Sequence, residues 1–185
     1  MYQLSAEYYD AIYLAMKDYA AETNLLKQII FAHLQTDGRR LLDIACGTGL
    51  HLEQLQTDFQ VEGMDISAEM IEVARRRLPG IPLHVGDMAN FFLRNTYDVI
   101  TCLFSSIGYV RTVERLQRAA ECMADHLKPG GVLLVEPWFT PEMWHPNTPH
   151  IATVDLPDLK IARVNTSMVD GRISILDLHH LVGTP

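Results

Sequence analysis

A glycine-rich turn between two ordered segments is the first feature that indicates chemistry. Residues 43–49 read Asp-Ile-Ala-Cys-Gly-Thr-Gly. This motif begins within the apolar run Arg40–Ala45 and is followed by a helical pattern over Leu50–Gln56. Glycine allows the backbone to turn sharply and to approach a ligand closely, and the start of a helix favours an acidic group. The motif begins with an acidic residue, unlike the G-x-G-x-x-G pattern of dinucleotide-binding proteins. Taken alone, it is also compatible with an ordinary strand-to-helix turn.

Two further carboxylates follow the next two predicted strands. Asp65 lies at the end of the strand predicted at Val61–Ile66, where it could accept hydrogen bonds from adjacent ribose hydroxyls. It could instead cap the next helix, although Ser67 is better placed to do so. Asp87 follows the strand predicted at Pro82–Val85, and its carboxylate could accept a hydrogen bond from the exocyclic amine of adenine.

Apolar side chains flank these two carboxylates. Met64, Ile66 and Met88 could enclose a flat base between them. Methionines at such positions also pack as ordinary core residues, so both interpretations stay open. The three motifs carry weight together, because each one comes at the end of a successive strand.

The elements predicted around these motifs bring them to one edge of a sheet. Apolar runs alternate with helical patterns, which predicts an α/β fold with a Rossmann-like, doubly wound parallel sheet. Further strands are predicted at Tyr97–Leu103 and Val132–Glu136, and helices at Ala68–Leu78 and Val113–His126. Right-handed crossovers place the carboxyl ends of all strands on the same edge, where such sheets bind ligands.

The two ends of the chain follow other patterns. Ala6–Phe31 is helical in pattern, so residues 1–38 are expected to form a helical cap. Prolines crowd the segment after residue 138, and two alternating runs then flank Asp170-Gly171, a strong hairpin signal. We therefore predict one domain over residues 1–185. Its core is residues 39–138, and residues 139–185 form a connecting segment and a C-terminal β-hairpin.

Composition argues against several classes of protein. The net charge of −8 disfavours a nucleic-acid partner, and no apolar run is long enough to span a membrane. The three cysteines are far apart and form no C-x-x-C pair, so neither a disulfide framework nor a metal site is expected. We expect a cytoplasmic protein.

The motifs together resemble those of the class I S-adenosylmethionine-dependent methyltransferases, over about Leu41–Trp138. The matching pieces are LLDIACGTG, EGMDIS, GDM, YDVITCLFSSIGY and LKPGGVLLVEPW. The resemblance implies the strand order 3-2-1-4-5 of a doubly wound methyltransferase sheet. It also implies S-adenosyl-L-methionine as cofactor, with its ribose at Asp65 and its adenine at Asp87. The other cofactor-binding residues that it implies are Asp43, Ala45, Cys46, Gly47, Gly49, Ile66, Met88, Leu103 and Phe104.

Less specific segments resemble the bacterial N,N-dimethyltransferases of nucleotide-linked aminodeoxysugars over nearly the whole chain. They are Tyr8-Tyr9-Asp10, Lys17-Asp18-Tyr19, the six residues 104–109 and the seven residues 136–142. This resemblance implies a small-molecule amine acceptor, lined by Tyr9 and Tyr109 as catalytic residues, and places Tyr19 near the amino-acid end of the cofactor. No nucleic-acid or membrane partner is expected, and a homodimer stays open.

Two other functions are alternatives. A non-catalytic cofactor-binding module, or a truncated inactive domain, is one of them, because a complete class I domain has two more strands after the fifth. We expect residues beyond Pro185 to belong to the native protein. Otherwise the hairpin at Lys160–Leu181 or a second subunit must cover the apolar fifth strand. A nicotinamide-dependent oxidoreductase fits less well, because the turn lacks the third phosphate-loop glycine.

Overall fold

The computed structural model describes residues 6–185, which form two compact units. The first unit contains Asp18–Trp138, and the second contains Tyr8–Lys17 with Phe139–Pro185. The N-terminal helical pattern is therefore not one helix. Residues 15–18 interrupt it, and the Asp18 carboxylate caps the second helix by accepting a hydrogen bond from the Ala21 N–H at 2.9 Å.

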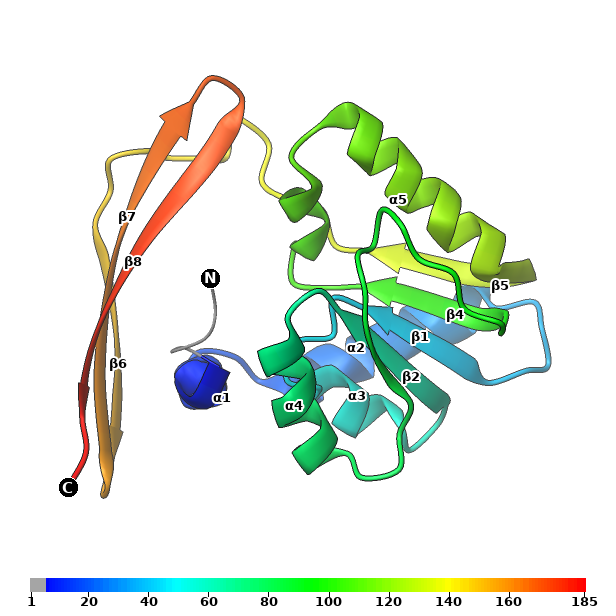
Figure 1. Cartoon of the computed structure of the whole chain (residues 1–185), viewed down its shortest axis with the longest axis horizontal. Helices are drawn as coiled ribbons and strands as arrows, with labels where there is room; N and C mark the ends of the chain where they lie inside the picture. The colour runs from blue at the N-terminus through cyan, green and yellow to red at the C-terminus, as the bar shows by residue number, and fades with distance from the viewer. Residues whose placement is uncertain (1–5) are drawn as a thin grey trace. The chain divides into compact units, whose positions relative to one another are not determined.

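The first unit is built on a five-stranded parallel sheet (Figure 1). Its strands are β1 (Arg40–Ile44), β2 (Gln60–Asp65), β3 (Leu83–Val85), β4 (Tyr97–Cys102) and β5 (Leu127–Val135). Their spatial order is β3-β2-β1-β4-β5, which confirms the predicted fold class and order. The order reverses between β1 and β4, so a ligand crevice is expected at their carboxyl ends.

Helices cover both faces of this sheet (Figure 1). Residues of α2 (Tyr19–His33), α3 (Leu50–Leu55) and α4 (Ala68–Arg77) form a core with one face. Residues of α5 (Val113–His126) form a second core with the other face. A short 3-10 helix, η1 (Ser106–Val110), follows β4.

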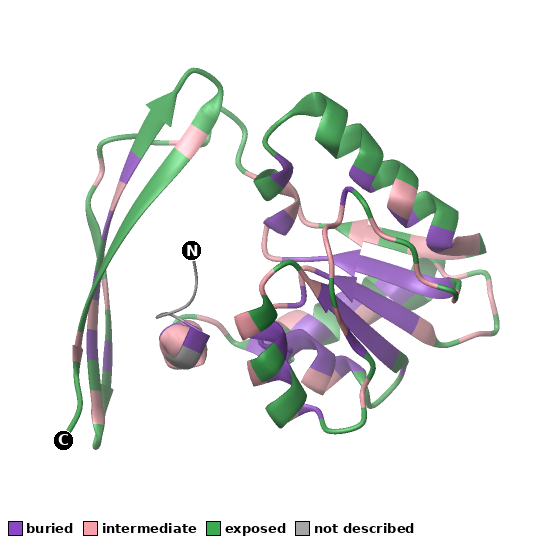
Figure 2. Cartoon of the chain, in the orientation of Figure 1, coloured by how far each residue is buried: buried purple, intermediate pink, exposed green. Residues whose placement is uncertain are grey.

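The central strands are buried on both sides, as the long apolar runs predicted. All six residues of β4 are buried (Figure 2). Its side chains pack on both faces of the sheet: Val99 belongs to the core under α2 to α4, and Ile100 belongs to the core under α5. β5 is the edge strand of the sheet. There Leu133 and Val135 are each 37% exposed.

The second unit is a three-stranded antiparallel sheet with helix α1 (Ala6–Leu14) packed on it. Its strands are β6 (His150–Leu156), β7 (Leu159–Asp170) and β8 (Ile173–Gly183), in the order β6-β7-β8. Ile12 of α1 packs against two residues of the sheet. None of the described helices is long and apolar enough to cross a membrane.

The predicted hairpin is present but has an additional strand. Asp170 pairs with Ile173 around a turn in which Gly171 has a φ of +58°. β6 extends this hairpin, and Leu156 pairs with Leu159 around a second tight turn. The prediction of a plain connecting segment was wrong over β6. Prolines on both sides of this strand concealed it, although they also fit an edge strand that ends in a turn.

Candidate active site

The turn after β1 has an unusual backbone. Ala45, Gly47 and Gly49 have φ angles of +59°, +55° and +84°. The Cys46 N–H donates a hydrogen bond to the Met64 carbonyl at 3.0 Å, which ties the turn to β2. Burial raises the pKa of the Cys46 thiol well above its usual value. Cys46 therefore serves as a small neutral side chain and not as a nucleophile.

The two glycines of this turn have different surroundings. A Cβ atom added to Gly47 would meet no other atom within 4 Å. A Cβ atom added to Gly49 would lie 2.9 Å from Leu78 and 3.4 Å from the side chain of Ala74 on α4. Gly49 is thus required for packing between the turn and α4. Gly47 faces open space, which is where a ligand could approach the backbone.

Asp65, at the end of β2, holds the turn in place. Its Oδ2 accepts a hydrogen bond from the Gly47 N–H at 2.9 Å, and its Oδ1 accepts one from the Ser67 N–H at 2.8 Å. Ser67 is the N-cap of α4, as predicted, because its hydroxyl accepts the Met70 N–H. The Ile66 N–H also acts as a donor to the Asp65 carboxylate, which keeps lone-pair capacity for a hydroxyl hydrogen. The structure therefore leaves room for the predicted ribose contact.

Asp43 lies below the turn, in the interior of the sheet. The side chain is only 2% exposed, and its Oδ1 accepts a hydrogen bond from the Thr101 hydroxyl of β4 at 2.7 Å. Burial raises the pKa of Asp43 to about 6, and the nearby His51 offsets part of this effect. Asp43 thus joins β1 to β4 beneath the ligand edge. Its predicted contact with the cofactor stays a prediction.

A small polar cluster borders the turn on the side of α2. Tyr19 is buried against His51 of α3, with ring centroids 4.9 Å apart. The His51 Nε2 lies 3.5 Å from an oxygen of Glu22. Tyr19 is therefore positioned beside the start of α3, next to the turn. Sequence analysis missed His51 and Glu22, because neither belongs to a motif.

The predicted adenine region contains one further residue that the sequence did not reveal. Arg115, on α5, donates to both carboxylate oxygens of Asp87, at 2.9 Å and 2.8 Å. This guanidinium holds the pKa of the Asp87 carboxyl below its usual value. Ile66 is 70% exposed and available to a ligand, and Met88 packs against the core under α5. Met64 is only 1% exposed, so it belongs to the core.

The turn after β4 lies beside the turn after β1, because Ile44 pairs with Cys102. Phe104 and Ser105 have φ angles of +55° and +56°, and neither is a glycine. The Phe104 N–H donates to the Glu136 Oε2 at 2.6 Å, and the Ser105 hydroxyl donates to the Pro137 carbonyl at 2.8 Å. Sequence analysis assigned Phe104 to the cofactor and placed Glu136 after the fifth strand at the active edge, in the segment 136–142 of the aminodeoxysugar resemblance, without a specific role.

The two predicted catalytic tyrosines belong to different units. Tyr109 lies in η1, near the end of β4, and is 58% exposed. Tyr9 lies in α1, where its ring packs against that of Tyr13, tilted by 48°, with the ring centroids 4.4 Å apart. Their action on one acceptor stays a prediction. Leu103 is 4% exposed, so little of its surface is available to line a cofactor pocket.

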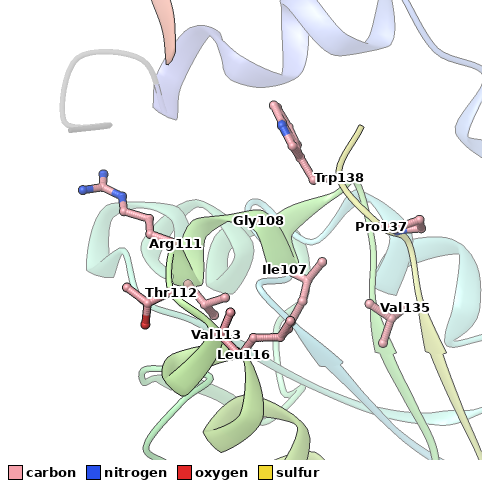
Figure 3. A pocket seen from close by; sticks show the side chains of 10 residues that line it. Ile107, Gly108, Arg111, Thr112, Val113, Leu116, Val135, Pro137 and Trp138 are labelled. Atoms are coloured by element: carbon pink, nitrogen blue, oxygen red, sulfur yellow. The ribbon is translucent and has the colours of Figure 1, made fainter. Parts of the chain in front are cut away.

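A pocket of about 400 Å³ opens between η1, the start of α5 and the end of β5. In Figure 3 the side chains of Ile107, Val113 and Leu116 lie together, and Arg111 extends away from them. The other lining residues include Val135, Pro137 and Trp138. The lining is almost wholly apolar.

Among residues 6–185, no group of three or more His, Cys, Asp or Glu side chains could hold a metal ion.

Comparison with known proteins matches the part of the chain that carries these motifs to a protein family. A family model described as a methyltransferase domain matches residues 41–131. The chain is 39% identical to a dTDP-4-amino-2,3,4,6-tetradeoxy-D-glucose N,N-dimethyltransferase of Saccharopolyspora spinosa, over 97% of this chain and 73% of that protein. It is 38% identical to a dTDP-3-amino-3,4,6-trideoxy-alpha-D-glucopyranose N,N-dimethyltransferase of Streptomyces venezuelae, over 100% of this chain and 79% of that protein.

Solved structures give the same result. The crystal structure of Streptomyces venezuelae DesVI matches with a TM-score of 0.93 and 38% identity, over 97% of this chain and 77% of that one. A structure of CalS10 from Micromonospora echinaspora, described as an amino pentose methyltransferase with bound S-adenosylmethionine, matches with a TM-score of 0.83 and 36% identity. It covers 95% of this chain and 80% of that one.

Proposed function

The chain belongs to the class I S-adenosylmethionine-dependent methyltransferases, and we propose that it methylates the amino group of a nucleotide-linked aminodeoxysugar. Family membership gives the cofactor, the reaction class and a small-molecule acceptor. The nature of the acceptor is the proposal. Its support is that three relatives at 38–40% identity are named for N,N-dimethylation of dTDP-aminodeoxysugars.

The geometry that supports the cofactor site is the open backbone at Gly47. When bound, S-adenosylmethionine supplies a methyl group activated by its sulfonium sulfur. The protein therefore has to bind the cofactor and the acceptor, orient them toward each other and exclude water. The free space beyond Gly47 allows close approach to the turn. Asp65 has lone pairs left for ribose hydroxyls, and Asp87 lies at the next strand end for the adenine amine. We assign Ala45–Gly49 to the methionine part.

The acceptor side needs orientation more than strong base catalysis. A neutral amine already carries the electron pair that attacks the methyl group, so a residue only has to align it and receive a proton afterwards. We assign alignment to Tyr109, which is exposed at the carboxyl edge. The catalytic role of Tyr9 stays what the resemblance implies. The apolar pocket beside η1 offers little to a charged sugar nucleotide, so we place the acceptor outside it.

The proposal is tested by turnover with defined acceptors. Purified protein is incubated with S-adenosylmethionine and with dTDP-sugars that carry the amine at C3 or C4, and S-adenosylhomocysteine release is measured. We expect release together with addition of methyl groups to the sugar amine, detected by mass spectrometry. Release with neither acceptor, from protein that binds the cofactor, would contradict the assigned acceptor class.

Tyr109→Phe tests the assigned role of the hydroxyl. We expect turnover to fall roughly 10-fold, the effect of one lost hydrogen bond, with cofactor affinity unchanged. Phe92→Leu is the control, because Phe92 is also an exposed aromatic residue, 84% accessible, but lies against His126 at the far end of α5. Lost cofactor binding with normal turnover at saturation would remove Tyr109 from the acceptor site.

Finer features of the protein are also proposals. We propose a cytoplasmic enzyme without nucleic-acid or membrane partners, which the net charge of −8 and the three free cysteines support. Light scattering on the purified protein would decide between a monomer and the homodimer that the resemblance leaves open.

A further inference from the structure

The backbone after β4 is strained at two consecutive residues. Phe104 and Ser105 both have left-handed φ angles, a conformation that residues other than glycine rarely adopt. Such a conformation persists only where the surroundings hold it. It occurs here directly beside the turn that we assign to the cofactor, so whatever holds it also sets the shape of the site.

The segment after β5 supplies the contacts that hold this turn. The Glu136 Oε2 accepts a hydrogen bond from the Phe104 N–H at 2.6 Å, and the next residue, Pro137, accepts one from the Ser105 hydroxyl. The Glu136 N–H donates to the Cys102 carbonyl at 2.9 Å, so its backbone continues the pairing between β4 and β5. Glu136 is therefore anchored by its backbone and reaches the turn with its side chain.

The turn after β1 has the same arrangement. Asp65 ends β2, the outer neighbour of β1, and accepts the N–H of Gly47 in the turn after β1. Glu136 follows β5, the outer neighbour of β4, and accepts the N–H of Phe104 in the turn after β4. A charged acceptor makes these hydrogen bonds stronger than neutral ones. Each of the two turns thus has one carboxylate that fixes its backbone.

We propose that Glu136 is a positioning residue for methyl transfer. Its carboxylate holds the strained turn so that Phe104 faces the cofactor and Tyr109, five residues on, faces the acceptor. The roles of Phe104 and Tyr109 in this proposal rest on the proposed function. The fixing of the turn by Glu136 does not, and it can be measured on the protein alone.

The first measurement is hydrogen exchange of the Phe104 amide, which needs neither cofactor nor acceptor. We expect this amide to be protected in the wild-type protein. Glu136→Ala should speed its exchange roughly 10-fold or more, the range for a lost charge-assisted hydrogen bond. Glu136→Gln keeps a side-chain oxygen acceptor and should retain most of the protection. Equal protection in the wild-type and Ala proteins overturns the proposal.

The second measurement separates positioning from direct contact with the acceptor. With S-adenosylmethionine and an aminosugar, Glu136→Ala should lower kcat roughly 10- to 100-fold, and Glu136→Gln should lower it much less. Adding Ser105→Gly to Glu136→Ala should restore part of kcat, because glycine adopts the left-handed conformation readily. Glu121→Gln, an exposed change on α5, should have no effect.

The outcomes are distinct. Equal losses in the Gln and Ala variants, a raised KM for the aminosugar and no recovery with Ser105→Gly would show that Glu136 binds the acceptor, which overturns the positioning role. A wild-type protein that methylates no aminosugar refutes the proposed function instead. Hydrogen exchange at Phe104 then still decides the inference, and Glu136→Gln serves if the Ala variant does not fold.

Discussion

The turns that follow β1 and β4 belong to neighbouring strands and reach a left-handed backbone conformation with different residue types. Both bring backbone N–H groups to the carboxyl edge of the sheet in left-handed conformations. The turn after β1 uses two glycines for this, and the turn after β4 uses none. Each is held by a carboxylate from an outer strand, Asp65 in the first turn and Glu136 in the second.

The difference shows what each turn provides. Gly47 leaves open space, so at this residue the first turn offers its backbone to a ligand without strain, although Ala45 earlier in the turn is left-handed. The second turn keeps a large side chain, Phe104, at the site and has to accept the strain. Left-handed backbone costs roughly 1–2 kcal/mol per non-glycine residue, and a hydrogen bond to a charged group contributes roughly 1.5–3 kcal/mol. The contact with Glu136 is therefore strong enough to offset much of the strain.

We expect the largest effect on cofactor binding from a side chain that fills the open space beside Gly47. Gly47→Val should weaken S-adenosylmethionine binding by at least about 100-fold, because the side chain fills the space of the ligand and strains the turn. Calorimetry measures the affinity, and circular dichroism shows that the domain stays folded. Gly80→Val is the control, since Gly80 also has a positive φ and open surroundings but belongs to no motif. A variant that binds normally would show that the ligand does not approach Gly47.

The next effect concerns Asp43, the buried carboxylate that joins β1 to β4 below both turns. Burial raises the pKa of Asp43 from its ordinary value of 3.8 to about 6 in the folded protein, so its contribution to stability is present below about pH 4 and is lost as the pH rises through 6. Asp43→Asn, which keeps an acceptor for Thr101, should remove this loss. Relative to the variant, the wild-type protein should lose roughly 2–3 kcal/mol of unfolding free energy between pH 4 and pH 7.

Urea unfolding of both proteins over this pH range measures the difference. Because all other groups titrate in both proteins, the difference isolates Asp43. Parallel stability curves would mean that Asp43 is not desolvated in the folded protein.

Removal of the carboxylate that fixes the first turn should have a comparable or smaller effect on binding. Asp65→Ala should weaken cofactor binding by roughly 1.5–3 kcal/mol, the range for hydrogen bonds to a charged group. Glu72→Ala, an exposed change on α4, is the control for calorimetry. Unchanged affinity in Asp65→Ala would refute its assignment to the ribose.

The smallest effects test the strain directly. Ala45→Gly should raise the unfolding free energy by roughly 0.5–1 kcal/mol, because it relieves a left-handed residue at some cost in chain entropy. Ser105→Gly should give a smaller gain, since it also removes the hydroxyl bond to Pro137. Denaturant unfolding of both variants measures the two values. A loss of stability in both would show that neither turn is strained.

Sequence reasoning was most successful where one residue type carries the physical signal. Long apolar runs predicted the buried strands, and Gly47 and Gly49 marked the first turn. The order of the strands came from the resemblance to the methyltransferases. The second turn has no such signal, because Phe104 and Ser105 are ordinary residues whose strain depends on a partner 32 positions away. A contact of that kind is set by strand order and register, which a local pattern does not contain.

Other features were missed for the same reason. Arg115 reaches Asp87 only because the fold brings the start of α5 to the turn after β3, and β6 is recognisable only through its pairing with β7. The break before Asp18 was the exception. It had a local signal, an N-cap residue inside a continuous helical pattern, which the apolar periodicity concealed.

The central claim is that the turns after β1 and β4 together form the cofactor site. Hydrogen exchange measured by mass spectrometry, with and without S-adenosylhomocysteine, tests it most directly. We expect slower exchange in peptides that cover Ala45–Gly49 and Leu103–Ser106, and no change at the β7–β8 turn around Gly171. Unchanged exchange at both of the first two segments, in protein shown to bind the ligand, would contradict the claim.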